Sequence, residues 1–270
     1  MKKILVLGST GMLGHMVLKV LAQEKAWKVK GMNASDFDAA NDVPDTHDYD
    51  YVINCIGVLA GGEEEKMKKV NAEFPHWLAK ATSARIIHMS TDGVFSGKSG
   101  PYDEDSPCDA EDAYGKSKIK GEVEAPNVIN IRTSIIGPSP NKKKGLLEWF
   151  LSQPEGATVQ GFTNHIWNGV TTLQFAQLCE KIIREDRFED LRAEASVFHF
   201  TPNEPITKYD LLCLFKKVFE KNVNVERMED HRGSVERVLT TKYEGLKKLF
   251  PYGRTMEEAV EELKKFSHPS

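Results

Sequence analysis

The feature that most constrains the fold is an alternation of short apolar runs with amphipathic stretches along the 270 residues. The apolar runs lie at residues 4–7, 27–32, 51–56, 85–89, 127–132 and 196–200. Helical patterns lie between most of them, at residues 12–24, 63–82, 113–124 and 173–186. Strands without a polar face that alternate with helices are typical of a parallel sheet covered on both sides. We therefore predict an α/β fold built on a doubly wound parallel sheet.

The first apolar run leads directly into a glycine-rich turn, in the stretch "LVLGSTGMLGHMVLKVL". Between a strand and a helix, Gly8 permits the tight turn, Gly11 lets the backbone approach a pyrophosphate, and Gly14 lets the helix pack close to the sheet. Free N–H groups at the start of the helix then favour a diphosphate. The alternative is a glycine-rich turn without a ligand. We predict a Rossmann-type domain that binds a dinucleotide.

The alternation of apolar runs and helical patterns becomes irregular after about residue 137, which indicates a second, smaller unit. Loops rich in aromatic and amide side chains separate three helical patterns, at residues 146–152, 208–221 and 255–266. We predict that residues 1–137 plus 172–200 form the NAD(P)-binding Rossmann domain. Residues 138–171 plus 201–270 would form a smaller C-terminal substrate-binding lobe. We interpret the three lysines at 142–144 as a solvated loop rather than a patch that steers a diphosphate.

The choice between NADPH and NADH depends on the end of the second strand, where an acid would bind the ribose and repel a 2′-phosphate. Asn33 follows this strand, and the first acid is Asp36, which lies 22 residues after Gly14 and several residues beyond the apparent strand end. We predict that Asn33, Asp36 and Phe37 lie on the adenine side. NADPH is the expected cofactor, and NADH is the alternative.

A tyrosine and a lysine four residues apart, Tyr114 and Lys118, lie in a helical stretch and therefore on one helix face. Tyr243 and Lys247 have the same spacing, so spacing alone does not identify the site. Position favours Tyr114, because it lies between the fourth and fifth strands, and the fourth ends near Thr91 at the edge where ligands bind. A lysine ammonium would favour the phenolate, the phenol would exchange a proton with a substrate carbonyl, and the threonine would hold that oxygen.

Composition excludes several other classes of protein. A net charge of −4 argues against a nucleic-acid-binding protein. The four cysteines include no C-x-x-C pair, so we predict neither a zinc ribbon nor a disulfide framework, and no metal site. No apolar run approaches the ~20 residues of a membrane span, and the first run is too short for a signal peptide. We expect a cytoplasmic protein that binds a small molecule and has no membrane contact.

The chain resembles the extended short-chain dehydrogenase/reductases, and most of all the dTDP-4-dehydrorhamnose reductase branch. The matching stretches follow in order along nearly the whole chain: "LVLGSTGMLG", "VINCIG", "VNAEFPHWLA", "STDGVFSG", "AYGKSKIKGE", "IRTSIIG", "GFTNHIWNGVTT" and "FHFTPNEPITKYDL". The resemblance implies an NADPH-dependent reductase of a nucleotide-linked 4-keto-6-deoxy sugar, with Thr91, Tyr114 and Lys118 as catalytic residues. It also implies a homodimer, since family members are often dimers.

Further site residues follow from the resemblance and from the aromatic and amide side chains of the lobe. The resemblance implies that the cofactor is contacted by Tyr114, Lys118, Gly8, Thr10, Gly11, Met12, Leu13, Cys55, Ile56, Gly57 and Arg132. We predict substrate contacts from Asp92, Gly93, Trp149, Asn164, His165, Trp167 and Asn168. For the last four of these, the alternative is a polar loop with one packed tryptophan.

Two questions stay open, namely which sugar is bound and which function the fold serves. The rhamnose enzymes usually have a tyrosine where this chain has Gly93, so the sugar could also be a UDP-linked N-acetyl sugar. The alternatives in function are a sugar-nucleotide epimerase or dehydratase of the same fold, and an NADP-binding regulatory subunit without turnover. Two side chains are interpreted structurally: His88 as a satisfied core histidine, and Asn71 as a helix N-cap rather than a residue near the active-site edge.

Overall fold

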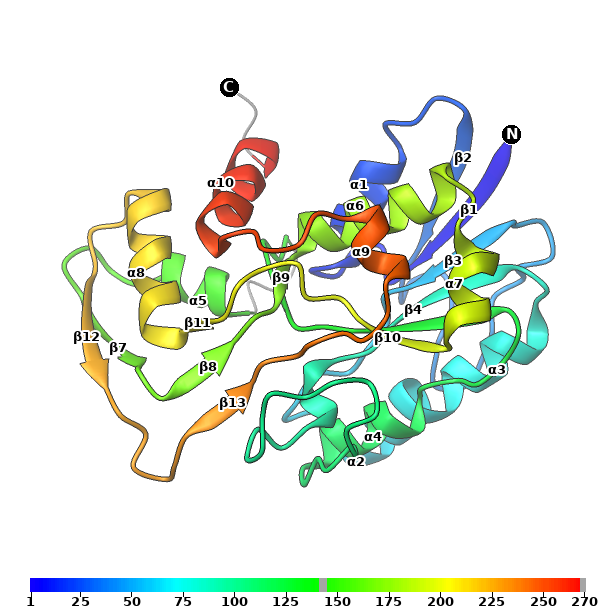
Figure 1. Ribbon diagram of the computed structural model, residues 1–270. Coiled ribbons are helices and arrows are strands. Elements are labelled where there is room, and N and C mark those ends of the chain that lie inside the picture. Colours follow the sequence, from blue (N-terminus) through cyan, green and yellow to red (C-terminus); the bar gives the residue numbers. More distant parts are fainter. Residues whose placement is uncertain (141–144, 268–270) are drawn as a thin grey trace.

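The predicted α/β fold is confirmed by the computed structural model, which describes residues 1–140 and 145–267 (Figure 1). Its centre is a parallel sheet with the strand order β2-β1-β3-β4-β5-β10. These strands are β1 (Lys2–Leu7), β2 (Trp27–Met32), β3 (Tyr51–Asn54), β4 (Arg85–Met89), β5 (Val128–Arg132) and β10 (Val197–His199). The lysines at 142–144 lie outside the described residues.

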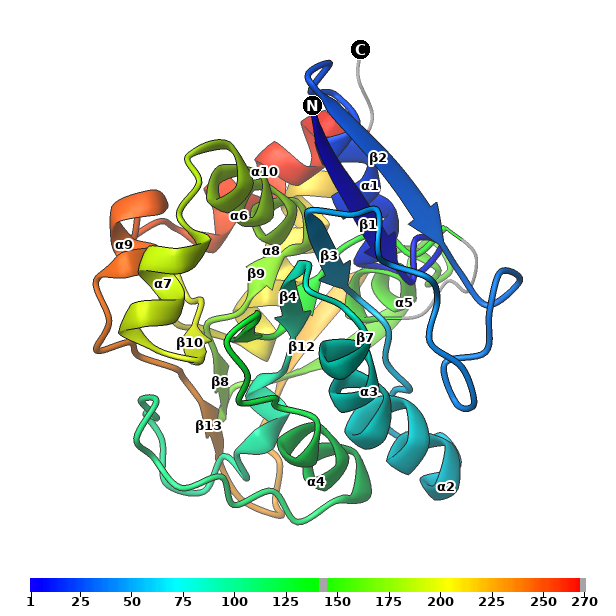
Figure 2. The same cartoon turned by 90° about the vertical axis from the view of Figure 1, so that its right-hand side faces the viewer.

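Helices cover both faces of the sheet, because successive side chains of a buried strand point to opposite sides (Figure 2). On one face Ile4 and Val6 join a core with α1 (Gly14–Leu21) and α6 (Thr172–Arg184). On the other face Leu5 and Leu7 pack with the helical segment after β3. That segment consists of α2 (Glu64–Met67), the π-helix η1 (Lys68–Glu73) and α3 (Phe74–Ala81), and α4 (Ala113–Lys120) packs beside it.

The connection between β2 and β3 determines where a ligand can bind. Residues 33–50, all of them described, contain turns but no helix, as predicted. This segment carries the chain past β1, so β1 lies between β2 and β3. Connections leave the sheet in opposite directions at this switch point, where open α/β sheets bind ligands at the carboxyl ends of their strands. The glycine turn that follows β1 lies there.

The C-terminal lobe is built from short strands around α8 (Lys208–Phe219), on the left of Figure 1. A parallel pair joins β7 (Thr158–Phe162) to β12 (Asn224–Met228). A second small sheet places β8 (His165–Trp167) between β11 (Ile206–Thr207) and β13 (Val235–Arg237). The remaining elements are the 3₁₀ turn η2 (Asp92–Val94), β6 (Ile135–Ile136), α5 (Leu146–Leu151), β9 (Val170–Thr171), α7 (Phe188–Glu194), α9 (Gly245–Leu249) and α10 (Met256–Ser267).

The last helices connect the lobe to the sheet. α10 packs against both α8 and α6, and α9 packs against α7 and α6. The apolar core is therefore continuous from the sheet into the lobe, and we keep the predicted division into two units as a proposal. Within the described ranges, no helix combines the length and the apolar character that crossing a membrane requires.

Candidate active site

The glycine turn after β1 has the geometry that a diphosphate requires. Gly8 has φ +78°, the left-handed conformation that favours glycine, and its amide donates to the Met32 carbonyl at 2.8 Å. A Cβ on Gly14 would lie 2.1 Å from the Gly8 carbonyl oxygen, so only glycine lets α1 start this close to the turn. Leu13, directly before α1, is apolar and cannot cap the helix with its side chain, which leaves N–H groups for an anion.

The other residues predicted to contact the cofactor pyrophosphate follow the same turn. Thr10 and Gly11 are exposed, and Met12 is half-buried. Leu13 is buried in the core, so it can offer a ligand its backbone but not its side chain. Cys55, which was predicted on the adenosine side, follows β3, and its carbonyl lies 3.2 Å from the position of a Cβ on Gly8. The structure thus brings the predicted pyrophosphate residues together at the switch point.

The residues predicted on the adenine side form a compact turn after β2. The Asn33 amide donates to the Asp36 carboxylate at 2.7 Å, and the Ser35 amide donates to the Asn33 side chain at 2.9 Å. Phe37 packs on Phe74, with 5.9 Å between ring centroids. The Asp36 carboxylate thus already accepts a hydrogen bond from its own turn. Ile56 and Gly57 follow β3 on the same edge of the sheet.

The predicted catalytic residues converge at the carboxyl end of β4. Thr91 lies two residues beyond β4, and its hydroxyl accepts the Gly93 amide at 3.0 Å and donates to Asp92 at 3.2 Å. Asp112 caps α4 by accepting the Gly115 amide at 2.8 Å, which places Tyr114 in the first turn. A Cβ on Gly93 would lie 3.3 Å from both the Tyr114 ring and the Thr91 hydroxyl.

The sequence predicts that the Lys118 ammonium favours the Tyr114 phenolate, but other groups act more strongly on the phenol in the structure. Burial raises the pKa of the Tyr114 phenol, the hydrogen bond from Thr91 lowers it, and Asp92 raises it. Burial lowers the pKa of Lys118 to about 8 against the attraction of Glu122. The Lys118 ammonium donates to the Met89 carbonyl at 2.7 Å and is not among the main influences on the phenol. A raised pKa keeps the phenol in its protonated form at neutral pH, which a proton donor requires.

Asn71 does not cap a helix, so this prediction was wrong. It lies inside the π-helix η1, where a π-turn often marks a functional site. Its side chain accepts the Val58 amide at 2.8 Å and donates to the Val58 carbonyl at 2.9 Å and to the Ser117 hydroxyl at 3.1 Å. Asn71 therefore ties the loop after β3 to the residue next to Lys118. The sequence did contain a sign that Asn71 is no cap, because it lies inside an apolar, helical stretch.

Arg132 is a structural residue rather than a free cofactor ligand. Its guanidinium forms two hydrogen bonds of 2.7 Å with the Glu122 carboxylate, and both side chains are buried. It also donates to the Cys108 sulfur at 3.1 Å and lies beside His199. We therefore withdraw its side chain from the proposed cofactor contacts. Charge alone gave no hint in the sequence that this arginine would be paired.

His88 is buried in the core as predicted, but it is only half satisfied. Its Nδ1 pairs with the Asn54 side chain at 3.0 Å, while its Nε2 has no hydrogen-bond partner within the described part of the chain. Burial holds the pKa of His88 well below its usual value, and the charge of Lys118 adds to that lowering. The imidazole is therefore neutral at neutral pH.

The amide residues predicted to bind substrate mainly hold the lobe together. Asn168 exchanges hydrogen bonds of 2.8 and 2.9 Å with the backbone of Leu239. Asn164 binds the backbone at Asp230 in the same way. His165 lies 3.1 Å from the Asp230 carboxylate and stacks on a phenylalanine. These side chains are already engaged, which supports the alternative reading of this segment.

Two other aromatic predictions have different outcomes. Trp167 is 3% exposed and lies under the Lys208 ammonium, which is 4.4 Å from the centroid of its ring. Trp149 is 42% exposed on α5, and its role remains a prediction. Sequence reasoning missed Lys208 and Arg237, which lie near Asp92 and act on its pKa. A lysine at the start of a predicted helix was the available signal, since the helix dipole disfavours it there.

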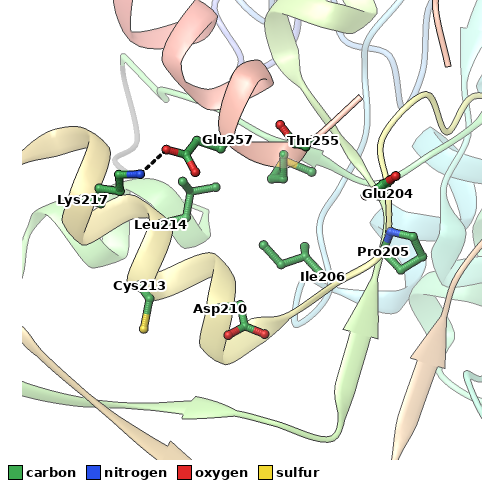
Figure 3. Close-up of a pocket in the computed structure, with 10 residues that line it drawn as sticks. Glu204, Pro205, Ile206, Asp210, Cys213, Leu214, Lys217, Thr255 and Glu257 are labelled. Carbon is green, nitrogen blue, oxygen red and sulfur yellow. Dashed lines mark hydrogen bonds and ion pairs between the residues drawn. The ribbon is translucent and has the colours of Figure 1, made fainter. Parts of the chain in front are cut away.

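An open groove of about 390 Å³ between α8 and α10 lies away from these residues (Figure 3). Ile206, Cys213, Leu214 and Thr255 line it, and Lys217 pairs with Glu257 across it. The residues that line this groove do not include Thr91, Tyr114 or Lys118. The groove is therefore not the candidate active site.

Comparison with known proteins identifies the family. The RmlD substrate binding domain family matches residues 1–238. The chain belongs to this family. The predicted resemblance to the dTDP-4-dehydrorhamnose reductase branch is confirmed at this level.

The similar proteins include an enzyme and a subunit of another enzyme. A dTDP-4-dehydrorhamnose reductase of Aggregatibacter actinomycetemcomitans is 26% identical over 252 residues, covering 83% of this chain and 81% of the relative. Methionine adenosyltransferase 2 subunit beta of Danio rerio is 26% identical over 248 residues, covering 81% and 74%. A solved dTDP-4-dehydrorhamnose reductase of Bacillus anthracis str. Ames, in complex with NADP, aligns with TM-score 0.78 at 17% identity, covering 99% and 100%. This last likeness supports the fold.

Proposed function

We propose that the protein is an NADPH-dependent reductase of a nucleotide-linked 4-keto-6-deoxy sugar. The observation that carries the proposal is the proximity of the Thr91 hydroxyl and the Tyr114 ring at the edge of the sheet that carries the glycine turn. A bound nicotinamide supplies the hydride to the C4 carbonyl. Tyr114 gives its proton to the oxygen that becomes negative, and Thr91 holds that oxygen by a hydrogen bond.

Lys118 acts on the cofactor side of the same site. Its pKa of about 8 leaves it mostly charged at neutral pH, and its position four residues after Tyr114 suits contact with the cofactor ribose. The hydrogen bond to the Met89 carbonyl holds the ammonium at this edge until a cofactor arrives.

The preference for NADPH is supported by the turn after β2. Asp36 is the first acid there, and its carboxylate accepts the Asn33 amide. Asp36 lies four residues beyond the end of β2, and its carboxylate is held within the turn. It is therefore not placed to repel a 2′-phosphate. A relative of the same fold was solved in complex with NADP. The exposed Gly11 and the uncapped start of α1 fit the diphosphate of this cofactor.

The second candidate is a regulatory subunit without turnover. It is favoured by the relatives that are named methionine adenosyltransferase 2 subunit beta, which match over about the same length as the reductase. Thr91, Tyr114 and Lys118 are all present, and this favours the enzyme. An epimerase or dehydratase would use the same fold but would regenerate its cofactor in each cycle.

One experiment separates these functions. The protein is mixed with NADPH and a panel of dTDP-, UDP- and GDP-linked 4-keto-6-deoxy sugars, and both the nicotinamide absorbance and the sugar products are measured. A reductase oxidises one NADPH for each sugar converted. Conversion without net oxidation indicates an epimerase or dehydratase. No conversion of any sugar, together with a stoichiometric partner in a pull-down, indicates the subunit.

A further inference from the structure

Lys208 lies where its own helix disfavours it. It is the first residue of α8, and Thr207 caps this helix by accepting the Asp210 amide at 3.0 Å. The positive end of the helix dipole therefore repels the Lys208 ammonium. The ammonium has no ion-pair partner among the described residues and lies over the Trp167 ring. Burial further lowers its pKa. A half-buried cation kept at such a cost indicates a ligand of opposite charge.

Arg237 is the second cation at this place. In the small lobe sheet it is the register partner of Trp167, so the two side chains lie next to each other. The Arg237 Nη2 reaches the Ser96 carbonyl only at 3.5 Å, and its buried Nε has no partner in the described ranges. The Trp167 indole N–H is also buried without one. Since buried polar groups are nearly always paired, two such donors side by side indicate a missing acceptor.

Both cations lie within electrostatic reach of Asp92, at the catalytic edge of the sheet. Burial raises the pKa of the Asp92 carboxyl, and the charges of Arg237 and Lys208 act against that rise. Burial also raises the pKa of Tyr114, and Arg237 opposes this in the same way. Among the residues that the structure describes, no direct ion pair joins either cation to Asp92. Two positive charges and one carboxylate leave one positive charge in surplus beside the phenol. Each phosphate of a diphosphate ester carries one negative charge, so the surplus matches one such phosphate.

We propose that Lys208 and Arg237, with the Trp167 indole N–H, bind the sugar-proximal phosphate of a nucleoside diphosphate sugar. This inference rests on the proposed function. A sugar whose C4 carbonyl lies at Tyr114 presents this phosphate on the opposite side of its ring, toward the lobe. Asp92 is the internal counter-charge that the two cations have before substrate binds. The cofactor diphosphate has its own place at the glycine turn, so the two anions do not compete.

The test measures binding of dTDP and UDP to the full-length protein by calorimetry in the presence of saturating NADP⁺. Lys208→Met and Arg237→Met each weaken the binding of whichever nucleotide the wild type binds by about tenfold or more, as expected for the loss of a charged hydrogen bond. Lys217→Met, on the exposed side of the same helix, changes it less than about twofold. Asp92→Asn tightens binding several-fold, because it removes the negative charge. A folding defect cannot produce that gain.

Each result bears on the proposal in a definite way. Wild-type affinity in both Lys208→Met and Arg237→Met overturns the phosphate subsite and leaves the proposed reductase standing. Equal weakening of NADPH binding, measured by its fluorescence, overturns the assignment to substrate. If the wild type binds neither dTDP nor UDP, the proposed substrate class is wrong. The same variants are then titrated with inorganic pyrophosphate, where loss of wild-type binding supports an anion site and unchanged or undetectable binding overturns it.

Discussion

Lys118→Met should abolish activity and yet make the protein more stable at neutral pH. Lys118 is 4% exposed, and its pKa falls from the usual 10.5 to about 8 because it is buried. The unfolded chain therefore binds more protons than the folded one between these values, so stability rises as pH rises through this window. At pH 7 the charged lysine costs the folded state about 3 kcal/mol, at ~1.4 kcal/mol per pH unit.

The net effect follows from two opposing contributions. Methionine removes the charge, and it also loses the hydrogen bond to the Met89 carbonyl, which is worth about 1 kcal/mol. We expect a net gain of about 2 kcal/mol at pH 7. At pH 10 the cost of the charge falls below about 1 kcal/mol, so the gain disappears.

Urea unfolding of wild type and Lys118→Met at pH 7 and pH 10 measures this difference directly. The exposed Lys217→Met is the matched control and should change stability by less than about 0.5 kcal/mol at either pH. A Lys118→Met variant that is less stable than wild type at both pH values would refute the reasoning. So would a stability difference that does not change with pH.

Three further substitutions test parts of the site. Gly14→Ala places a methyl group against the Gly8 carbonyl, so it should cost about 1–3 kcal/mol in thermal unfolding and reduce NADPH affinity. Gly11→Ala is the comparison, because its Cβ would lie 3.3 Å from the nearest atom, and it should cost less stability. Asn71→Ala should cost about 2–4 kcal/mol in urea unfolding, because it leaves the half-buried backbone groups of Val58 and the buried Ser117 hydroxyl without their partner. A cost under ~1 kcal/mol would contradict this structural role.

The sheet and the glycine turn could be predicted from sequence because their signals are local. Each buried strand is a continuous apolar run, and the turn after β1 uses glycine for steric reasons that hold in any such fold. Gly8 and Gly14 have the geometry expected of them. The short lobe strands, such as β8 and β13, could not be predicted, because two or three residues give no periodic pattern.

The site was only partly predictable, because burial and pairing depend on contacts between distant segments. Tyr114 and Thr91 were found from their position relative to the strands. Asn164 and Asn168 looked like free amide donors, yet each is engaged with backbone more than 60 residues away. Arg237 was missed because its importance comes from Trp167 and Asp92, which no sequence spacing connects to it.

The most direct test of the central claim is Tyr114→Phe, which removes only the phenol oxygen. The matched control is Tyr243→Phe, since Tyr243 has the same spacing to a lysine but packs on Phe198. With a sugar that the wild type reduces, we predict a rate of NADPH oxidation at least about 10³-fold lower for Tyr114→Phe, with NADPH affinity within about twofold of wild type. Tyr243→Phe should keep its rate. Wild-type turnover by Tyr114→Phe would contradict the proposed proton donor.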